Sequence, residues 1–146
     1  MNSEDSKELL ENAPVGRLGT CLGNEPYVTP LNFVYDNEKI YFHSAKVGRK
    51  LENMKSNPKV CFEVDQLIGI KQGEVGCDFG CYYQSVIISG EARIVESESQ
   101  KVRILEKLVS KYALKNIKPV FENSKLERID VVEIQVENMS GKQCLP

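Results

Sequence analysis

Hydrophobic and polar residues alternate along several segments of this chain with the period of a β-strand. In Lys59–Asp65, Val60, Phe62 and Val64 fall on one face and the residues between them on the other, which is typical of a half-buried strand. Similar patterns, bounded by turn residues, predict six strands at residues 15–22, 27–35, 39–44, 59–72, 82–95 and 127–137.

Three helices are expected between or beside these strands. The first lies within residues 1–13, the second follows Ser44 and ends at Asn57, and the third is a flanking helix at residues 98–113. In the second, Val47, Leu51 and Met54 are spaced to share one helical face. It ends where it does because the residue before a proline resists the helical conformation.

Six strands with tight connections predict a mainly β fold, an antiparallel split β-barrel with flanking helices, because closing a sheet removes its exposed edges. Pro30 lies inside the second predicted strand and cannot donate a ladder hydrogen bond. We therefore expect the barrel to be split near Pro30. A chain of 146 residues is expected to form a single domain, residues 1–146.

Charge and composition argue against two classes of partner. The net charge is −2, and acidic and basic residues are mixed along the chain, so no basic surface for nucleic acid is predicted. No apolar run reaches the roughly 20 residues that span a bilayer, and the acidic start MNSEDSKELLENAP is unlike a signal peptide. We expect a cytoplasmic protein.

The cysteines suggest neither disulfides nor a metal site. They number five, Cys21, Cys61, Cys77, Cys81 and Cys144, with no regular framework. Cys77 and Cys81 have a spacing that a metal site could use, but structural zinc wants four matched ligands. We predict no metal site and expect these two residues to border the mouth of a pocket. A role of their thiols in substrate reduction is a weaker alternative.

The start of the second helix carries the strongest chemical signal. Gly48, Arg49 and Lys50 open this helix directly after a predicted strand. Unpaired N–H groups in a first helical turn attract anions, and two cations strengthen that attraction. A phosphate is therefore the predicted ligand, the alternative being a solvated basic face. His43, the only histidine, lies just upstream and is either a catalytic residue or a structural one.

These motifs together resemble a known family. The most specific pieces are His43-Ser44-Ala45, Gly48-Arg49-Lys50, Asn57-Pro58 and Tyr83-Gln84-Ser85-Val86. In this order they are similar to the FMN-binding split-barrel superfamily of pyridoxamine 5'-phosphate oxidase-like proteins, and most similar to its nitroimidazole-resistance branch. The resemblance covers about Val15 to Lys142.

The resemblance implies a homodimer with two flavin sites at the subunit interface. FMN is the expected cofactor, with FAD or a deazaflavin less favoured. The resemblance implies that Arg49 and Lys50 bind the phosphate near Gly48, with Ser44 and Ala45 on the adjoining backbone. The flavin ring is expected to lie along Pro30, Leu31, Asn32 and Phe33, with His43 close to it. Tyr83, Gln84 and Ser85 are expected to reach a flavin, often that of the partner subunit.

Three functions stay open. We favour an FMN-dependent oxidoreductase that passes electrons from NAD(P)H to a nitroaromatic, nitroimidazole or similar electrophile. The alternatives are a non-enzymatic flavin module for storage or redox sensing, and a small nucleic-acid-binding barrel suggested by Tyr27 and Tyr35. Vitamin B6 oxidation is disfavoured because the C-terminal Arg and His pair of those oxidases is missing, and haem handling because there is no second histidine.

Overall fold

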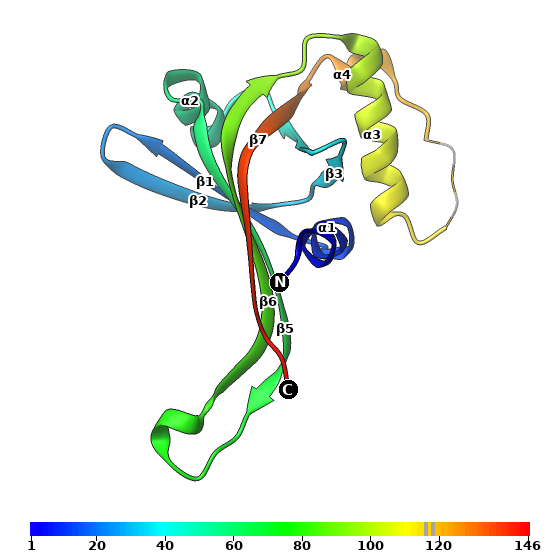
Figure 1. Ribbon diagram of the computed structural model, residues 1–146. Coiled ribbons are helices and arrows are strands. Elements are labelled where there is room, and N and C mark those ends of the chain that lie inside the picture. The colour runs from blue at the N-terminus through cyan, green and yellow to red at the C-terminus, as the bar shows by residue number, and fades with distance from the viewer. Residues whose placement is uncertain (116, 118) are drawn as a thin grey trace.

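The strands form one antiparallel sheet that curls into an incomplete barrel (Figure 1). A computed structural model of the chain describes residues 1–115, 117 and 119–146. The strands are β1 (Gly16–Leu22), β2 (Glu25–Leu31), β3 (Val34–Asp36), β4 (Lys39–Ala45), β5 (Lys59–Lys71), β6 (Gly80–Ile94) and β7 (Ile129–Cys144). Their order across the sheet is β2-β1-β5-β6-β7-β4-β3. The predicted fold class is confirmed, with seven strands instead of six.

The additional strand arises where the predicted second strand breaks. Asn32 and Phe33 leave the sheet, so residues 27–35 divide between β2 and β3. These two strands are the edges of the sheet, and the barrel is therefore split between them. Pro30 lies in β2, and an edge strand is a position that tolerates proline. The predicted split of the barrel near Pro30 is confirmed.

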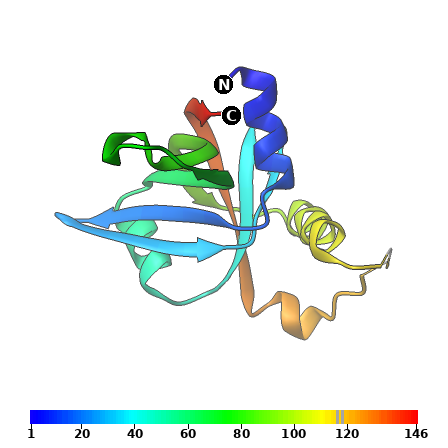
Figure 2. The same ribbon diagram turned by 90° about the horizontal axis from the view of Figure 1, so that it is seen from below.

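Helices cover two sides of the sheet. They are α1 (Ser3–Asn12), α2 (Arg49–Ser56), α3 (Glu98–Tyr112) and α4 (Asn123–Leu126), with a short 3₁₀ helix, η1 (Gly76–Asp78). Figures 1 and 2 show α2 and α3 on opposite sides of the barrel. Within the described residues, none of the helices has the length and apolar character needed to cross a membrane.

Three local expectations are wrong. Val47 precedes α2 and is 80% exposed, so it does not share the buried face of that helix, whose buried residues are Leu51, Asn53 and Met54. The last strand does not stop at residue 137, because β7 continues to Cys144. The structure also has α4, where the sequence predicted neither a helix nor a strand; residues 116 and 118, which precede it, lie outside the described residues.

The sheet packs on two apolar clusters, one on each face. The larger one fills the barrel and includes Leu18, Phe42, Phe62, Val64, Ile88 and Ile134. The smaller one lies under α3 and includes Tyr41, Ile104, Leu105, Leu108 and Val131. Because successive strand residues face opposite ways, β4 contributes Phe42 to the first cluster and Tyr41 to the second. Each fully buried apolar side chain stabilises the fold by roughly 1.5–3 kcal/mol.

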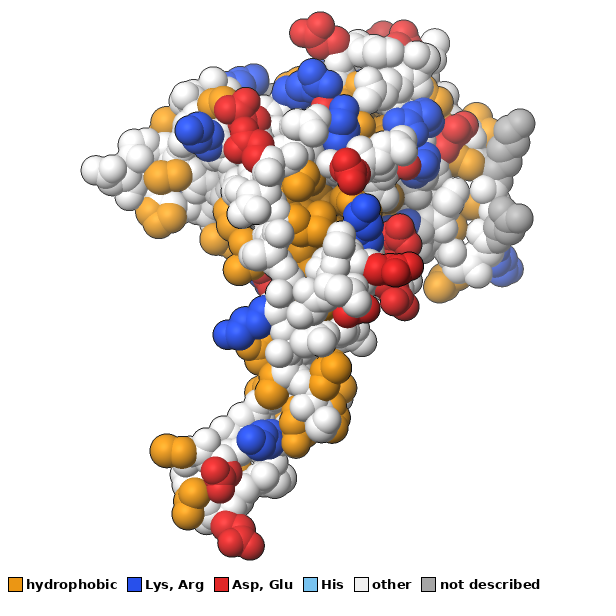
Figure 3. Space-filling view, viewed as in Figure 1, with side chains coloured by type: hydrophobic (Ala, Val, Ile, Leu, Met, Phe, Trp, Pro, Cys, Tyr) orange, Lys and Arg blue, Asp and Glu red, His pale blue; other side chains and the backbone are white. Residues whose placement is uncertain are grey.

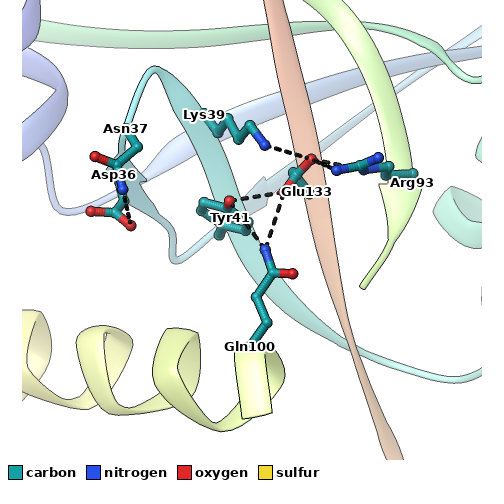
Figure 4. Close-up of polar contacts among 7 residues, drawn as sticks. All are labelled: Asp36, Asn37, Lys39, Tyr41, Arg93, Gln100 and Glu133. Carbon is teal, nitrogen blue, oxygen red and sulfur yellow. Dashed lines mark hydrogen bonds and ion pairs between the residues drawn. The ribbon is translucent and has the colours of Figure 1, made fainter. Parts of the chain in front are cut away.

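A buried carboxylate joins α3 to the outer face of the sheet (Figure 4). Glu133 on β7 has no exposed surface. Its oxygens accept hydrogen bonds from Tyr41 Oη at 2.8 Å, Arg93 Nε at 2.7 Å, Lys39 Nζ at 3.2 Å and Gln100 Nε2 at 3.3 Å. Two cations and two neutral donors therefore replace the water that Glu133 loses on folding.

Gly90 on β6 provides a test of how closely the strands pack. A Cβ atom at Gly90 would lie 2.1 Å from the backbone oxygen of Gln135 on β7. We expect Gly90→Ala to lower the free energy of unfolding by about 2 kcal/mol, because the neighbouring backbone must move. Gly80→Ala is the control, since nothing lies within 4 Å of a Cβ there. Equal urea midpoints for the two variants would contradict this packing.

Beyond the barrel, β5 and β6 continue as a two-stranded arm with the end of β7 beside it (Figure 1). Figure 3 shows hydrophobic side chains along this arm. The exposed apolar residues of this segment are Leu67, Ile68, Ile70, Val75, Phe79 and Ile87, each between 43% and 61% exposed. Exposed apolar side chains gathered on one segment make the arm a candidate interaction surface.

Candidate functional site

The N-terminus of α2 presents free backbone donors. Gly48 is its N-cap residue, with φ of 135°, a conformation that favours glycine, and no side chain among the described residues caps the helix. The carbonyl of Gly48 accepts from the N–H groups of Leu51 and Glu52. Within the described residues, the N–H groups of Arg49 and Lys50 have no such partner. Nothing lies within 4 Å of a Cβ placed on Gly48, so the space before the helix is open.

Arg49 extends from this helix start toward β2. Its guanidinium lies 4.7 Å from the centre of the Tyr27 ring, and its Nη2 lies 3.2 Å from Glu25 Oε2. Both charged side chains are more than half exposed, and such ion pairs contribute only about 0–1 kcal/mol. An anionic ligand can therefore replace Glu25 at little cost. Sequence reasoning missed Glu25 and Tyr27 as neighbours of Arg49, because the hairpin register was needed to find them.

The end of β4 leads directly into the α2 N-terminus. His43 and Ala45 are exposed there, whereas Ser44 is 4% exposed and faces the barrel interior. The hydroxyl of Ser44 has no hydrogen-bond partner among the described residues, which is uncommon for a buried polar atom. Because β3 pairs with β4 only as far as Tyr41, this end of β4 also has a free edge.

The segment between β2 and β3 is only partly available to a ligand. Pro30 and Asn32 are exposed and Leu31 is half-buried. Phe33 is fully buried, with its ring 4.9 Å from that of Phe62. The side chain of Phe33 therefore belongs to the hydrophobic core.

Tyr112 at the end of α3 holds this segment in place. Its hydroxyl accepts from the N–H of Phe33 at 3.0 Å and lies 3.1 Å from the carbonyl oxygen of Phe33 and 3.0 Å from that of Pro14. One phenol thus satisfies backbone groups where the ladder is interrupted. The sequence places Tyr112 near the end of the predicted flanking helix, and no local pattern there indicates its contact with Phe33.

Removing this hydroxyl should loosen the split. In Tyr112→Phe, the N–H of Phe33 loses its partner while the ring remains, and an unsatisfied buried donor costs about 1–3 kcal/mol. We expect a decrease of that size in the free energy of unfolding, measured by urea denaturation. The matched control is Tyr83→Phe, whose hydroxyl makes no hydrogen bond within the part of the chain that is described. An effect as large in Tyr83→Phe would contradict the role of Tyr112.

Lys111 lies beside the same segment. Its Nζ is 3.9 Å from the centre of the Phe33 ring and 3.4 Å from the carbonyl oxygen of Leu10. Burial lowers the pKa of Lys111 to about 8, against a smaller opposing effect of Glu11. Sequence reasoning missed this residue, because nothing in the pattern distinguishes it from the other lysines of α3.

The last predicted contact segment lies elsewhere in the protomer. Tyr83, Gln84 and Ser85 are on the arm, where they pair with β5 and with residues 142–144 of β7. Gln84 Nε2 donates to Gln143 Oε1 at 3.2 Å. The arm and α2 are at opposite ends of the molecule in Figure 1. The structure thus brings residues 43–50 together but places residues 83–85 apart from them.

The cysteines are all free thiols, and Cys77 and Cys81 are exposed near the tip of the arm. Burial raises the pKa of Cys61, with a smaller contribution from Glu63, which disfavours its thiolate. Across the described ranges, no group of three or more His, Cys, Asp or Glu side chains could hold a metal ion.

Known proteins resemble this chain in sequence and in fold. An uncharacterised protein from Rhizobium meliloti is 24% identical over 90 residues, which are 62% of this chain and 52% of that protein. The aligned segment thus spans about half of the curated relative.

Two solved structures share the fold over nearly the whole chain. The flavocytochrome Anf3 from Azotobacter vinelandii has a TM-score of 0.87 at 23% identity, covering 99% of this chain and 68% of that one. A protein assigned to 5-nitroimidazole antibiotic resistance from Bacteroides thetaiotaomicron has a TM-score of 0.83 at 23% identity, covering 96% and 82%. A family model described as pyridoxamine 5'-phosphate oxidase matches residues 2–143. The chain therefore belongs to the pyridoxamine 5'-phosphate oxidase family.

Proposed function

We propose that this protein binds a flavin, FMN in the first place, with the flavin phosphate at the N-terminus of α2. The proposal rests on three features of this helix start: backbone N–H groups of Arg49 and Lys50 that have no hydrogen-bond partner within the described residues, the two cationic side chains, and the open space before Gly48. The buried Ser44 hydroxyl without a partner supports the same location, since a bound polar group would satisfy it. The fold shared with a flavocytochrome is consistent with this ligand class.

The flavin site is completed by a second copy of the chain. Tyr83, Gln84 and Ser85 lie on an arm that exposes apolar side chains, and they are remote from Arg49 within one protomer. A homodimer would bury the arm and let these three residues reach the flavin of the partner. The free edge of β4 leaves room for that approach.

Ile70 tests this arrangement because it is 58% exposed on the arm. Ile70→Glu should place a charge in the subunit interface, so we expect a monomer by light scattering and a flavin content reduced at least tenfold. Val120→Glu is the control, since Val120 is 90% exposed and outside the arm. A variant that remains dimeric and retains its flavin would overturn the proposed interface.

The activity proposed for this site is electron transfer from NAD(P)H to a nitroaromatic, nitroimidazole or similar electrophile. A bound flavin supplies the hydride and single-electron chemistry, and the protein binds and orients it. Arg49 and Lys50 hold the phosphate, and the backbone of Leu31 and Asn32 supports the ring. The exposed imidazole of His43 can give a proton to an oxygen of the reduced substrate.

Two measurements test the function in sequence. The purified protein should show a flavin absorption spectrum, and mass spectrometry of the released ligand should identify FMN. It should then oxidise NADH or NADPH in the presence of nitroimidazoles, nitroaromatics or quinones. Protein that contains flavin but turns over none of these compounds would favour storage or redox sensing. Protein that neither contains nor binds flavin would overturn the proposal.

A further inference from the structure

A small cavity lies between α2 and the end of β6, on the side of α2 that faces the barrel. Its volume is about 150 Å³, and its apolar lining comes from Leu51, Met54, Ala92, Ile94 and Val132. Lys55 completes the lining on α2, and none of the lining residues is acidic. Arg93 also lines the cavity, but its guanidinium is bound to Glu133 (Figure 4).

The backbone of β6 along this cavity lacks a strand partner on one side. β5 begins at Lys59, which pairs with Glu91, so among the described strands only β7 pairs with the residues of β6 after Glu91. Ala92 donates its N–H to the carbonyl of Pro58 at 2.8 Å. Pro58 cannot return a hydrogen bond to the Ala92 carbonyl, because proline has no N–H.

In an antiparallel strand, the backbone N–H and C=O groups of successive residues point to opposite sides, which fixes the direction of these groups in residues 92–95. Val95 donates to the carbonyl of Val131 on β7 at 2.8 Å, so Arg93 and Val95 direct their backbone groups toward β7. The carbonyl of Ala92 and the N–H of Ile94 consequently point away from β7, to the side of the cavity. Within the described part of the chain, neither group has a hydrogen-bond partner.

We propose that this cavity binds a planar six-membered cyclic amide. The ring N–H donates to the Ala92 carbonyl and the ring carbonyl accepts from the Ile94 N–H, which is how an adjoining strand would pair with this edge. The volume suits one such ring, since an apolar cavity of about 150 Å³ accommodates benzene. Leu51, Met54 and Val132 contact the faces of the ring. Lys55 favours ligands that carry a second carbonyl.

This cavity is separate from the proposed phosphate-binding site. That site uses the N-terminal groups of α2 at Arg49 and Lys50, whereas the residues of α2 that line the cavity are Leu51, Met54 and Lys55. Binding of a cyclic amide therefore does not depend on the flavin proposal, and either one can fail without the other.

The test uses 2-pyridone, a simple six-membered cyclic amide, and nitrogen-15 NMR of the full chain. Titration should move the amide resonance of Ile94, while that of Val95 moves less because it is already bonded to Val131. N-methyl-2-pyridone has the same carbonyl but no N–H, and should bind at least about tenfold more weakly. Equal affinity of the two compounds, or no shift at Ile94, would overturn the proposal.

A variant and a competition experiment sharpen the result. Ala92→Leu places a larger side chain in the cavity and should weaken 2-pyridone binding at least about tenfold. The exposed neighbour Glu91→Gln should leave it unchanged. If Ala92→Leu does not fold, the affinities of the two pyridones for the unchanged protein still test the proposal. FMN that competes with 2-pyridone and shifts the Ile94 amide would assign the cavity to the flavin ring and overturn a separate site.

Discussion

Replacing Arg49 and Lys50 together with alanine should lower the affinity for FMN by about a hundredfold or more. Each charge-assisted hydrogen bond to a phosphate is worth about 1.5–3 kcal/mol, and two are lost. The fold should be unaffected, because Arg49 is exposed and its ion pair with Glu25 contributes little. Titration of the apoprotein with FMN, followed by the change in flavin absorbance, measures the effect.

Riboflavin is the control ligand for this prediction. It carries the same ring without the phosphate, so its affinity should be nearly equal in the double variant and the unchanged protein. Lys59→Ala is the control protein, because it removes a lysine that is exposed at the start of β5. If the double variant bound FMN as tightly as the Lys59→Ala protein does, the phosphate could not lie at the N-terminus of α2.

The main features of the fold could be predicted because they depend on short-range patterns. Alternation in residues 59–65 identified a half-buried strand, and Pro30 indicated an edge near the split. The break at Asn32 and Phe33 could not be predicted, since Phe33 reads as a strand residue. Its backbone leaves the ladder because the Tyr112 hydroxyl, 79 positions away, satisfies it instead.

The extent of the candidate site was predictable only where the chain itself is continuous. Residues 43–50 join the end of β4 to the start of α2, so their proximity follows from the sequence. The contacts of Arg49 with Glu25 and Tyr27 depend on the β1–β2 hairpin and the packing of α2, which no local pattern reveals. A site shared between two subunits is harder still to predict, because within one chain residues 83–85 pair with β5 and β7 and lie apart from residues 43–50.

Glu133 shows the same limit for charged residues in a strand. A glutamate is expected to face solvent, yet α3 and Tyr41 cover Glu133. Burial raises the pKa of Glu133, but the hydrogen bonds from Tyr41, Lys39 and Arg93 outweigh burial and hold that pKa below its usual range. Burial and the same carboxylate raise the pKa of Tyr41 to about 12.

Glu133→Gln should destabilise the fold by about 3 kcal/mol, because it leaves a buried amide facing two cations that lose their charge partner.

The stabilisation by the Glu133 carboxylate should depend on pH with a defined sign. It is fully present above the unfolded-state pKa of about 4.3, and it is lost as the pH falls through the lower pKa of the folded state. The stability difference between variant and parent should therefore be largest near pH 7 and shrink below about pH 4. Urea unfolding across this range measures it, with exposed Glu91→Gln as the control, expected within about 0.5 kcal/mol at every pH. A constant difference for Glu133→Gln would assign the loss to shape instead of charge.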